Sequence, residues 1–364
     1  MFISSLVALI PAICQLLLYK ASTGEYLVWS YKSEGFDFVS PHIFNELFSY
    51  SKGLLFYSPI CFLSLFGLIR LYQLNKYQFF GTVLYLIINV YVISSWWCWN
   101  YGATFGTRAF IEMFPVFFFL IALLLSFKSN AIKALSVSLI LLFSSYSIFQ
   151  IYQNENQILD NDFRTDAKGY WSIFLKTEGY SGKDYKYPVD ERKENIIKHL
   201  VFFNDVEKVD SSWINNNTRT TEKAHSGVFS SKVKKDTPYS IGVFKKIENI
   251  PYSRNVLIRV SGWFNIAKKG SHAFMALSFS NNGSSFCFNS FDLDLYMNNY
   301  GVWEYKTFEL YMPKFTVKEE NKVGNQFETY LFNNSDVDCY IDDLKLEFIQ
   351  FKNMERVLDN SWDI

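Results

Sequence analysis

The sequence is poor in the residues that build common catalytic and metal centres. Its four histidines and five cysteines form no CxxC pair and no paired Cys/His spacing. It has no excess of either charge, since 35 Lys and Arg balance 35 Asp and Glu. These absences exclude zinc-finger and thiol-redox motifs, give no support for a Ser-His-Asp triad, and exclude the basic surface of a nucleic-acid-binding protein.

The charges are divided unevenly along the chain. Residues 1–152 are rich in Phe, Leu, Ile and Tyr and carry only eight Lys or Arg and five Asp or Glu. The remaining 27 basic and 30 acidic residues follow. This break predicts an α-helical membrane part and then a soluble part. We expect a transmembrane region at 1–152, a linker with short helices at 153–200, a β-sandwich at 201–350 and a C-terminal tail at 351–364.

About five segments are long and apolar enough to predict transmembrane helices. They are residues 2–19, 53–71, 77–97, 109–127 and 131–152. The links at 71–76 and 128–133 carry lysines and no acid, so the positive-inside rule places both in the cytoplasm. The 20–52 loop, the 96–108 loop and everything after residue 152 are therefore expected outside.

The start of the chain indicates a retained helix. Residues 2–19 lack the N-terminal cation and cleavage site of a secretory signal, and the abrupt start suggests the later part of a longer protein. The aromatic 20–52 loop fits either an interfacial helix or an ordinary aromatic belt.

A single arginine follows a tryptophan-rich loop in "SWWCWNYGATFGTRAF" (95–110). Arg108 is either an interface anchor with Trp96 and Trp99 as its belt, or a phosphate-binding fork beside a sugar or lipid. Glu112 lies at the i+4 position, where a helix would let it orient Arg108. Gly102 and Gly106 predict a tight turn just before the arginine.

The stretches "LFSYSKGLLFYSPICFLSLFGL" (47–68) and "WWCWNYGATFGTRAFIEMFPVF" (96–117) resemble the rear membrane half of bacterial GT-C glycosyltransferases. These enzymes are similar to protein O-mannosyltransferases and aminoarabinose transferases. The resemblance implies a polyprenyl-phosphate sugar donor, the bacterial cytoplasmic membrane, and a phosphate-binding role for Arg108. It also implies a catalytic carboxylate pair in the first outer loop. That loop offers only separate acids, of which Glu34 and Asp37 fit the role poorly: Glu25, Glu34, Asp37 and Glu46. The catalytic front half is therefore expected to be absent, and a protein partner would have to supply it.

Alternation of apolar and polar residues begins near residue 200, as in "NVLIRVSGWFNI" (255–266). Several such segments separated by turn residues predict an all-β sandwich, a jelly roll. "FFNDVE" (202–207) and "YIDDLKLE" (340–347) resemble carbohydrate-binding-type jelly rolls. The resemblance implies a structural calcium ion held by Glu207 and Asp342, with Asp205 and Asp343 as weaker candidates. The alternative is that these acids are solvated at strand ends.

The aromatic and cysteine residues of the sandwich leave two further alternatives. Trp213, Trp263 and Trp303 fit core positions better than sugar-stacking positions. Cys287 and Cys339 either pair in an extracytoplasmic disulfide or remain free.

Two functions remain open. The first is the rear portion of a glycosyltransferase that handles a lipid-linked sugar at the outer membrane surface. The second is a non-catalytic membrane anchor that displays a sandwich to glycan or protein partners.

Overall fold

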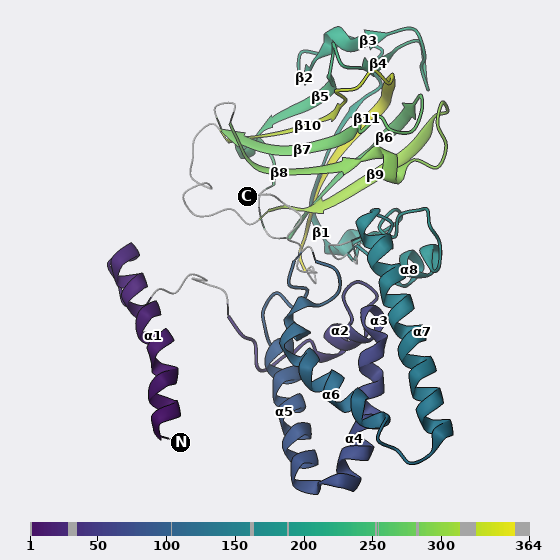
Figure 1. Cartoon of the computed structure of the whole chain (residues 1–364). Coiled ribbons are helices and arrows are strands. Elements are labelled where there is room, and N and C mark those ends of the chain that lie inside the picture. The colour runs from purple at the N-terminus through teal and green to yellow at the C-terminus, as the bar shows by residue number, and fades with distance from the viewer. Residues whose placement is uncertain are drawn as a thin grey trace.

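The chain consists of a helical region and a β-sandwich that stands on one end of it (Figure 1). The structure, a computed structural model, describes residues 2–27, 35–102, 104–160, 164–187, 189–251, 253, 255–281, 284–313 and 325–353.

Ten helical elements cover the first half of the described chain. They are α1 (Phe2–Thr23), α2 (Ile43–Phe48), α3 (Leu54–Tyr57), η1 (Pro59–Phe62), α4 (Leu63–Leu74), α5 (Lys76–Ser94), η2 (Arg108–Met113), α6 (Phe114–Leu124), α7 (Asn130–Glu155) and α8 (Ala167–Ile173). Local sequence explains two of the starts, because the side chains of Asn75 and Ser129 accept hydrogen bonds from the first turns of α5 and α7. Helices α4 and α6 pack closely at Gly67, where a β-carbon would lie 2.0 Å from the Leu120 carbonyl oxygen.

Helices cover all five predicted spans, but the spans are not equivalent. Within the described residues, α5 and α7 are long and apolar enough to cross a membrane, and the apolar stretch Pro59–Leu74 is shorter. The segment predicted at 53–71 is divided into α3, η1 and α4, and the segment predicted at 109–127 starts as the 3-10 helix η2. Five membrane-spanning helices therefore stay a prediction.

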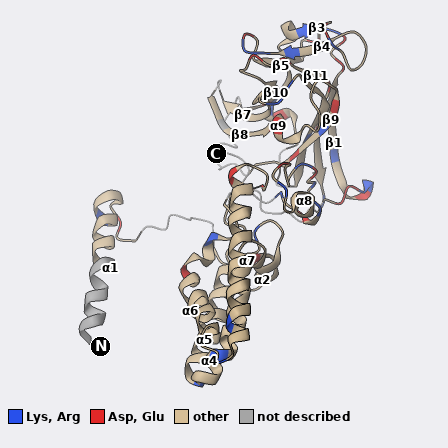
Figure 2. Ribbon diagram, turned by 45° about the vertical axis from the view of Figure 1, so that its right-hand side comes forward, with Lys and Arg blue, Asp and Glu red and all other residues tan. Residues whose placement is uncertain are grey.

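Basic residues mark the end of α4, α5 and α7 that lies farthest from the sandwich (Figure 2). Arg70 fixes this end, because its guanidinium donates to the hydroxyl and carbonyl oxygens of Ser126 at 3.0 Å each. The arrangement is the one that the positive-inside rule requires if this end is cytoplasmic.

The second half of the described chain forms an antiparallel β-sandwich, as predicted. Its strands are β1 (Ile196–Asn204), β2 (Trp213–Ile214), β3 (Arg219–Thr220), β4 (Ser230–Val233), β5 (Tyr239–Lys246), β6 (Val256–Ile266), β7 (Phe274–Asn281), β8 (Ser284–Asp292), β9 (Glu304–Tyr311), β10 (Asn325–Phe332) and β11 (Cys339–Phe351). One sheet has the order β3-β4-β11-β6-β9, with β1 also paired to β11, and the other has the order β2-β5-β10-β7-β8.

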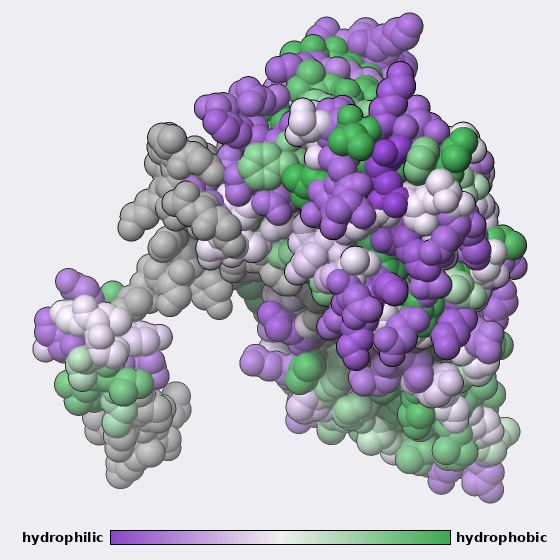
Figure 3. Space-filling view, turned by 90° about the horizontal axis from the view of Figure 1, so that it is seen from above, coloured by the Kyte–Doolittle hydropathy of each residue, from purple (hydrophilic) through white to green (hydrophobic). Residues whose placement is uncertain are grey.

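The two sheets enclose one apolar core of alternate strand residues, such as Ile258, Val260 and Phe264 of β6. Seen from above, the sandwich presents a largely hydrophilic surface with scattered hydrophobic residues (Figure 3). The 201–350 boundary predicted for this domain begins inside β1, whose first residue is Ile196.

The linker contacts both the helices and the sandwich. The Tyr170 hydroxyl of α8 lies 2.5 Å from the Tyr146 hydroxyl of α7. Beyond α7, the Tyr180 hydroxyl donates to Asp160 at 2.8 Å, while the Tyr180 ring belongs to the sandwich core. The Arg164 guanidinium lies 5.2 Å from the centre of the Phe291 ring in β8. Residues 156–180 therefore contact both parts of the chain.

Candidate functional site

The tryptophan loop follows the C-terminal end of α5. Trp96 packs edge-on against Phe36 with 5.0 Å between ring centres, and Trp99 is buried near the His42 ring at 6.1 Å. Arg108 follows as the first residue of η2 and is exposed. The tryptophans thus contact the 35–42 segment of the loop between α1 and α2.

The expected pairing of Arg108 with Glu112 is wrong in this structure. The two residues lie on a 3-10 helix, which has three residues per turn, so positions i and i+4 do not share one face. Both side chains are exposed, and in the described part of the chain no ion pair joins them. The roles of Arg108, Trp96, Trp99 and Glu112 in ligand binding remain predictions.

A different acid lies beside this loop. Glu46 of α2 is fully buried, and its Oε2 accepts a hydrogen bond of 2.9 Å from the hydroxyl of Thr107, the residue before Arg108. Its Oε1 is buried without a partner. Burial raises the pKa of Glu46 to about 8, although the Thr107 hydrogen bond acts in the opposite direction. Glu46 therefore carries a proton at neutral pH and leaves no bare charge in the interior.

Two buried side chains hold the loop that precedes Arg108. Lys52 is also fully buried, and its Nζ donates to the carbonyl oxygen of Thr104 at 2.5 Å. Together with the Glu46–Thr107 bond, this contact fixes both ends of the 104–107 segment. In the sequence, Glu46 is the single charged residue of "IFNELF", but no neighbouring residue indicates that Thr107 is its partner.

Both glycines of the predicted tight turn have the left-handed backbone that such a turn uses, with φ angles of +75° at Gly102 and +57° at Gly106. At Gly106 a β-carbon would also lie 3.0 Å from the β-carbon of Tyr57. The glycine is therefore needed both for its backbone conformation and for close packing against α3. Of the other outer-loop acids, Asp37 is exposed and caps the 38–40 turn, while Glu34 lies outside the described residues.

The residues predicted to bind calcium hold a loop of the sandwich instead. Oε1 of Glu207 accepts hydrogen bonds from the amides of Val228 and Phe229 at 2.8 Å each. Oδ2 of the buried Asp342 accepts from the amides of His225 and Ser226 at 2.8 and 3.2 Å. Burial raises the pKa of Asp342 to about 6.

Amide hydrogens thus occupy Oε1 of Glu207 and both oxygens of Asp342, which leaves few of these oxygens for a cation. The other two candidates are also engaged locally, since Asp205 accepts from the Glu207 amide and Asp343 contacts His225 and Ser226. Across the described residues, no three His, Cys, Asp or Glu side chains are grouped so that they could hold a metal ion. Calcium binding stays a hypothesis that a chelator can test.

The three sandwich tryptophans differ in their positions. Trp213 is buried in the core, as expected. Trp263 and Trp303 are half-buried on the outer face of the six-stranded sheet, so the core prediction is wrong for them. The His225 ring stacks on Trp263 with 3.7 Å between ring centres, which covers that face of the indole.

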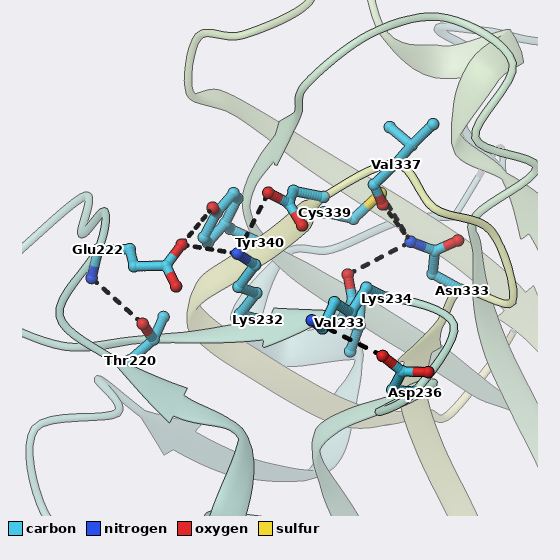
Figure 4. A network of polar contacts seen from close by, with 11 residues as sticks. Thr220, Glu222, Lys232, Val233, Lys234, Asp236, Asn333, Val337, Cys339 and Tyr340 are labelled. Atoms are coloured by element: carbon cyan, nitrogen blue, oxygen red, sulfur yellow. Dashed lines mark hydrogen bonds and ion pairs between the residues drawn. The ribbon is translucent and has the colours of Figure 1, made fainter.

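Ion pairs occupy the rim of this same sheet (Figure 4). Lys232 lies between Glu222 and Asp338 at 2.6 and 3.1 Å, and the Tyr340 hydroxyl donates to Glu222 at 3.0 Å. These polar groups satisfy one another. Contacts within the chain thus cover Trp263 and the Lys232 rim, while Val201, Phe203 and Tyr305 on this sheet stay about half exposed.

The outer face of the five-stranded sheet is different, and sequence reasoning missed it. Tyr239 of β5, Phe332 of β10 and Phe274 of β7 form a row across three neighbouring strands. Ring centres lie 5.2 Å apart between Tyr239 and Phe332, and 4.9 Å apart between Phe332 and Phe274. Tyr330 and Phe288 adjoin the row at 5.3 and 6.2 Å. We refer to these five residues as the aromatic row.

Small and polar residues lie beside the aromatic row. Gly242 and Ala276 flank Tyr330 on the neighbouring strands, and Glu328 faces Ser278 one step further along. At Gly242 a β-carbon would meet the Thr329 carbonyl oxygen at 2.5 Å. The face therefore combines apolar rings with hydrogen-bonding groups.

Cys287 and Cys339 are both buried, and in the described part of the chain no disulfide joins them.

The C-terminal region is similar to carbohydrate-binding modules at low identity. A family 16 carbohydrate-binding module is 16% identical, with 35% of this chain and 82% of that chain covered and a TM-score of 0.24. The CBM22-1 xylan-binding domain of Paenibacillus barcinonensis Xyn10C is 11% identical, with 41% and 94% covered and a TM-score of 0.27. The C-terminal family 22 module of Clostridium thermocellum Xyn10B is 11% identical, with 46% and 100% covered and a TM-score of 0.26.

No family model and no curated protein matches the sequence. At these TM-scores the likeness says nothing about binding, and the sandwich is established by its own strand pairing.

Proposed function

We propose that this chain is a membrane-anchored glycan-binding protein whose sandwich displays a sugar site on the five-stranded sheet. The observation that carries the proposal is the aromatic row. Aromatic side chains usually fill the core, where they bury a large area. Here five of them point outward beside groups that form hydrogen bonds, while the alternate residues of the same strands fill the core.

The proposed location is the outer side of a bacterial cytoplasmic membrane. It is supported by the lysines of the two short links and by the apolar surface of the long helices. Only 6% of the apolar window of α5 and 11% of that of α7 is buried within the chain. Helices of this composition need an apolar surrounding, and a bilayer supplies one.

Binding of neutral polysaccharides to the chain in lipid nanodiscs tests the proposal. Tyr239→Ala removes a half-exposed ring of the aromatic row, and we expect it to weaken binding at least tenfold. The matched control is Tyr305→Ala, which removes a similarly exposed ring from the other sheet. Equal binding by both variants, or no binding of any glycan by the unaltered chain, would rule out this site.

The second candidate function is the rear portion of a glycosyltransferase that uses a polyprenyl-phosphate sugar. The clamped 104–107 segment beside Arg108 favours it, since two fully buried side chains fix the backbone just before an exposed guanidinium. A protein partner would supply the missing catalytic half. Arg108→Lys keeps the charge but loses the two-pronged fork. Full activity of that variant in an assembled enzyme would exclude a phosphate clamp.

A further inference from the structure

Helix α2 has its polar and apolar residues reversed relative to a helix on the surface of a soluble protein. Its single charged residue, Glu46, points inward and is fully buried. Phe44 and Phe48 point outward and are 73% and 42% exposed. In water, burial of the rings and exposure of the carboxylate would be favoured. The observed orientation is the favourable one in hydrocarbon.

The segment before α2 has the same character. Phe36, Phe38 and Val39 are all about half exposed or more, and they lie against the outer end of α5. The Phe38 carbonyl oxygen accepts a hydrogen bond from the Tyr91 hydroxyl at 2.7 Å, so that hydroxyl is already satisfied. Residues 36–48 thus present several exposed apolar side chains beside the C-terminal end of α5. We call this segment the apolar shelf.

An apolar groove lies between this shelf and α5. It has a volume of about 360 Å³ and is lined by Ile43, Leu86, Ile87, Val90 and Tyr91. The groove offers no hydrogen-bonding group to a polar ligand, because its lining is apolar and the Tyr91 hydroxyl already donates to Phe38. The neighbouring rings of Phe44 and Phe48 point outward, as they would toward hydrocarbon. A hydrocarbon chain is therefore the occupant that fits this surface.

We propose that the groove between α2 and α5 holds one acyl chain of an outer-leaflet phospholipid, while residues 36–48 lie in the membrane interface. Below the groove, α5 continues with the exposed apolar residues Leu84 and Phe80, along which the rest of the chain can extend. This inference rests on the membrane placement in the proposed function. It adds a defined lipid site to that placement.

The first measurement tests the membrane placement. A Cys14→Ser, Phe44→Cys chain is labelled with bimane and placed in nanodiscs with or without dibrominated phosphatidylcholine. Quenching of the bimane is expected, because Phe44 points outward from α2. Absence of quenching would refute the interfacial position of α2, and the membrane placement with it.

The second measurement tests the groove. Ile87→Trp fills the groove, whereas Leu141→Trp adds the same ring to a similarly exposed position on α7, away from the groove. Phospholipids that remain after mild detergent extraction are counted by native mass spectrometry. We expect the Ile87→Trp chain to retain one phospholipid fewer than the Leu141→Trp chain. Equal numbers of retained phospholipids in the two variants, with bimane still quenched, would overturn the groove site alone. Retention of a polyprenyl phosphate in place of a phospholipid would overturn it as well.

Discussion

The hydroxyl of Thr107 donates a 2.9 Å hydrogen bond to the carboxyl group of Glu46, 61 residues earlier in the chain. This bond joins α2 to the 96–107 loop and lies next to Arg108. Burial raises the pKa of Glu46 to about 8, so the protonation of this carboxyl group depends on the fold.

The protonated state predicts how stability varies with pH. The folded chain keeps the Glu46 proton up to about pH 8, whereas the unfolded chain releases it above the ordinary value of 4.5. The free energy of unfolding should therefore fall between these values as pH rises, by at most about 1.4 kcal/mol per pH unit. Glu46→Gln should flatten this dependence in melting experiments in detergent at pH 5.5 and 8. Glu25→Gln, at an exposed acid near the end of α1, should leave it unchanged.

Chelation should leave the melting temperature of the chain unchanged, because amide groups occupy Oε1 of Glu207 and both oxygens of Asp342. Glu207→Ala should instead destabilise the sandwich by about 1–3 kcal/mol, since two amides lose their acceptor. Glu207→Gln keeps a carbonyl acceptor and should cost less. A drop of several degrees with a chelator, absent in Glu207→Ala, would establish a structural cation.

The two loop glycines give a matched pair of substitutions. Gly102→Ala meets no atom within 4 Å, so it should cost only the about 1–2 kcal/mol of a left-handed backbone. Gly106→Ala has the same backbone cost and also presses on Tyr57, so its melting temperature should be lower. Equal melting temperatures would show that α3 moves aside.

Topology can be tested by labelling in a Cys14→Ser background. A membrane-impermeant maleimide should label Lys269→Cys in intact cells and Asn130→Cys only after permeabilisation. Both positions are exposed, in the β6–β7 loop and at the start of α7. Labelling of both in intact cells would contradict the proposed orientation.

Elements with a strong local pattern were predictable. Alternation identified strands such as β6, and apolar length identified α5 and α7, because both signals depend on neighbours in sequence. The aromatic row was not predictable. Phe274 in the row and Phe279 in the core lie on the same strand and differ only in which face they occupy.

The predicted pairing of Arg108 with Glu112 was wrong for a related reason. An i+4 spacing was interpreted as a shared face, but the segment forms a 3-10 helix, and no sequence rule fixed that choice. The actual neighbour of this loop, Glu46, comes from a distant segment. Only the packing of α2 on the 96–107 loop brings the two together.

The contact between α7 and the linker has a mechanical consequence. The Gln153 side chain of α7 donates to the carbonyl oxygens of Ile173 and Lys176, at 2.8 Å each, at the end of α8. A domain on a flexible tether of n residues wanders over about 5–6 Å times the square root of n. The contacts of the linker with α7 and with the sandwich core restrict this domain to a much smaller range of positions. A polymer captured by the sandwich would be held at one height above the bilayer, and a pull on it would load α7 directly.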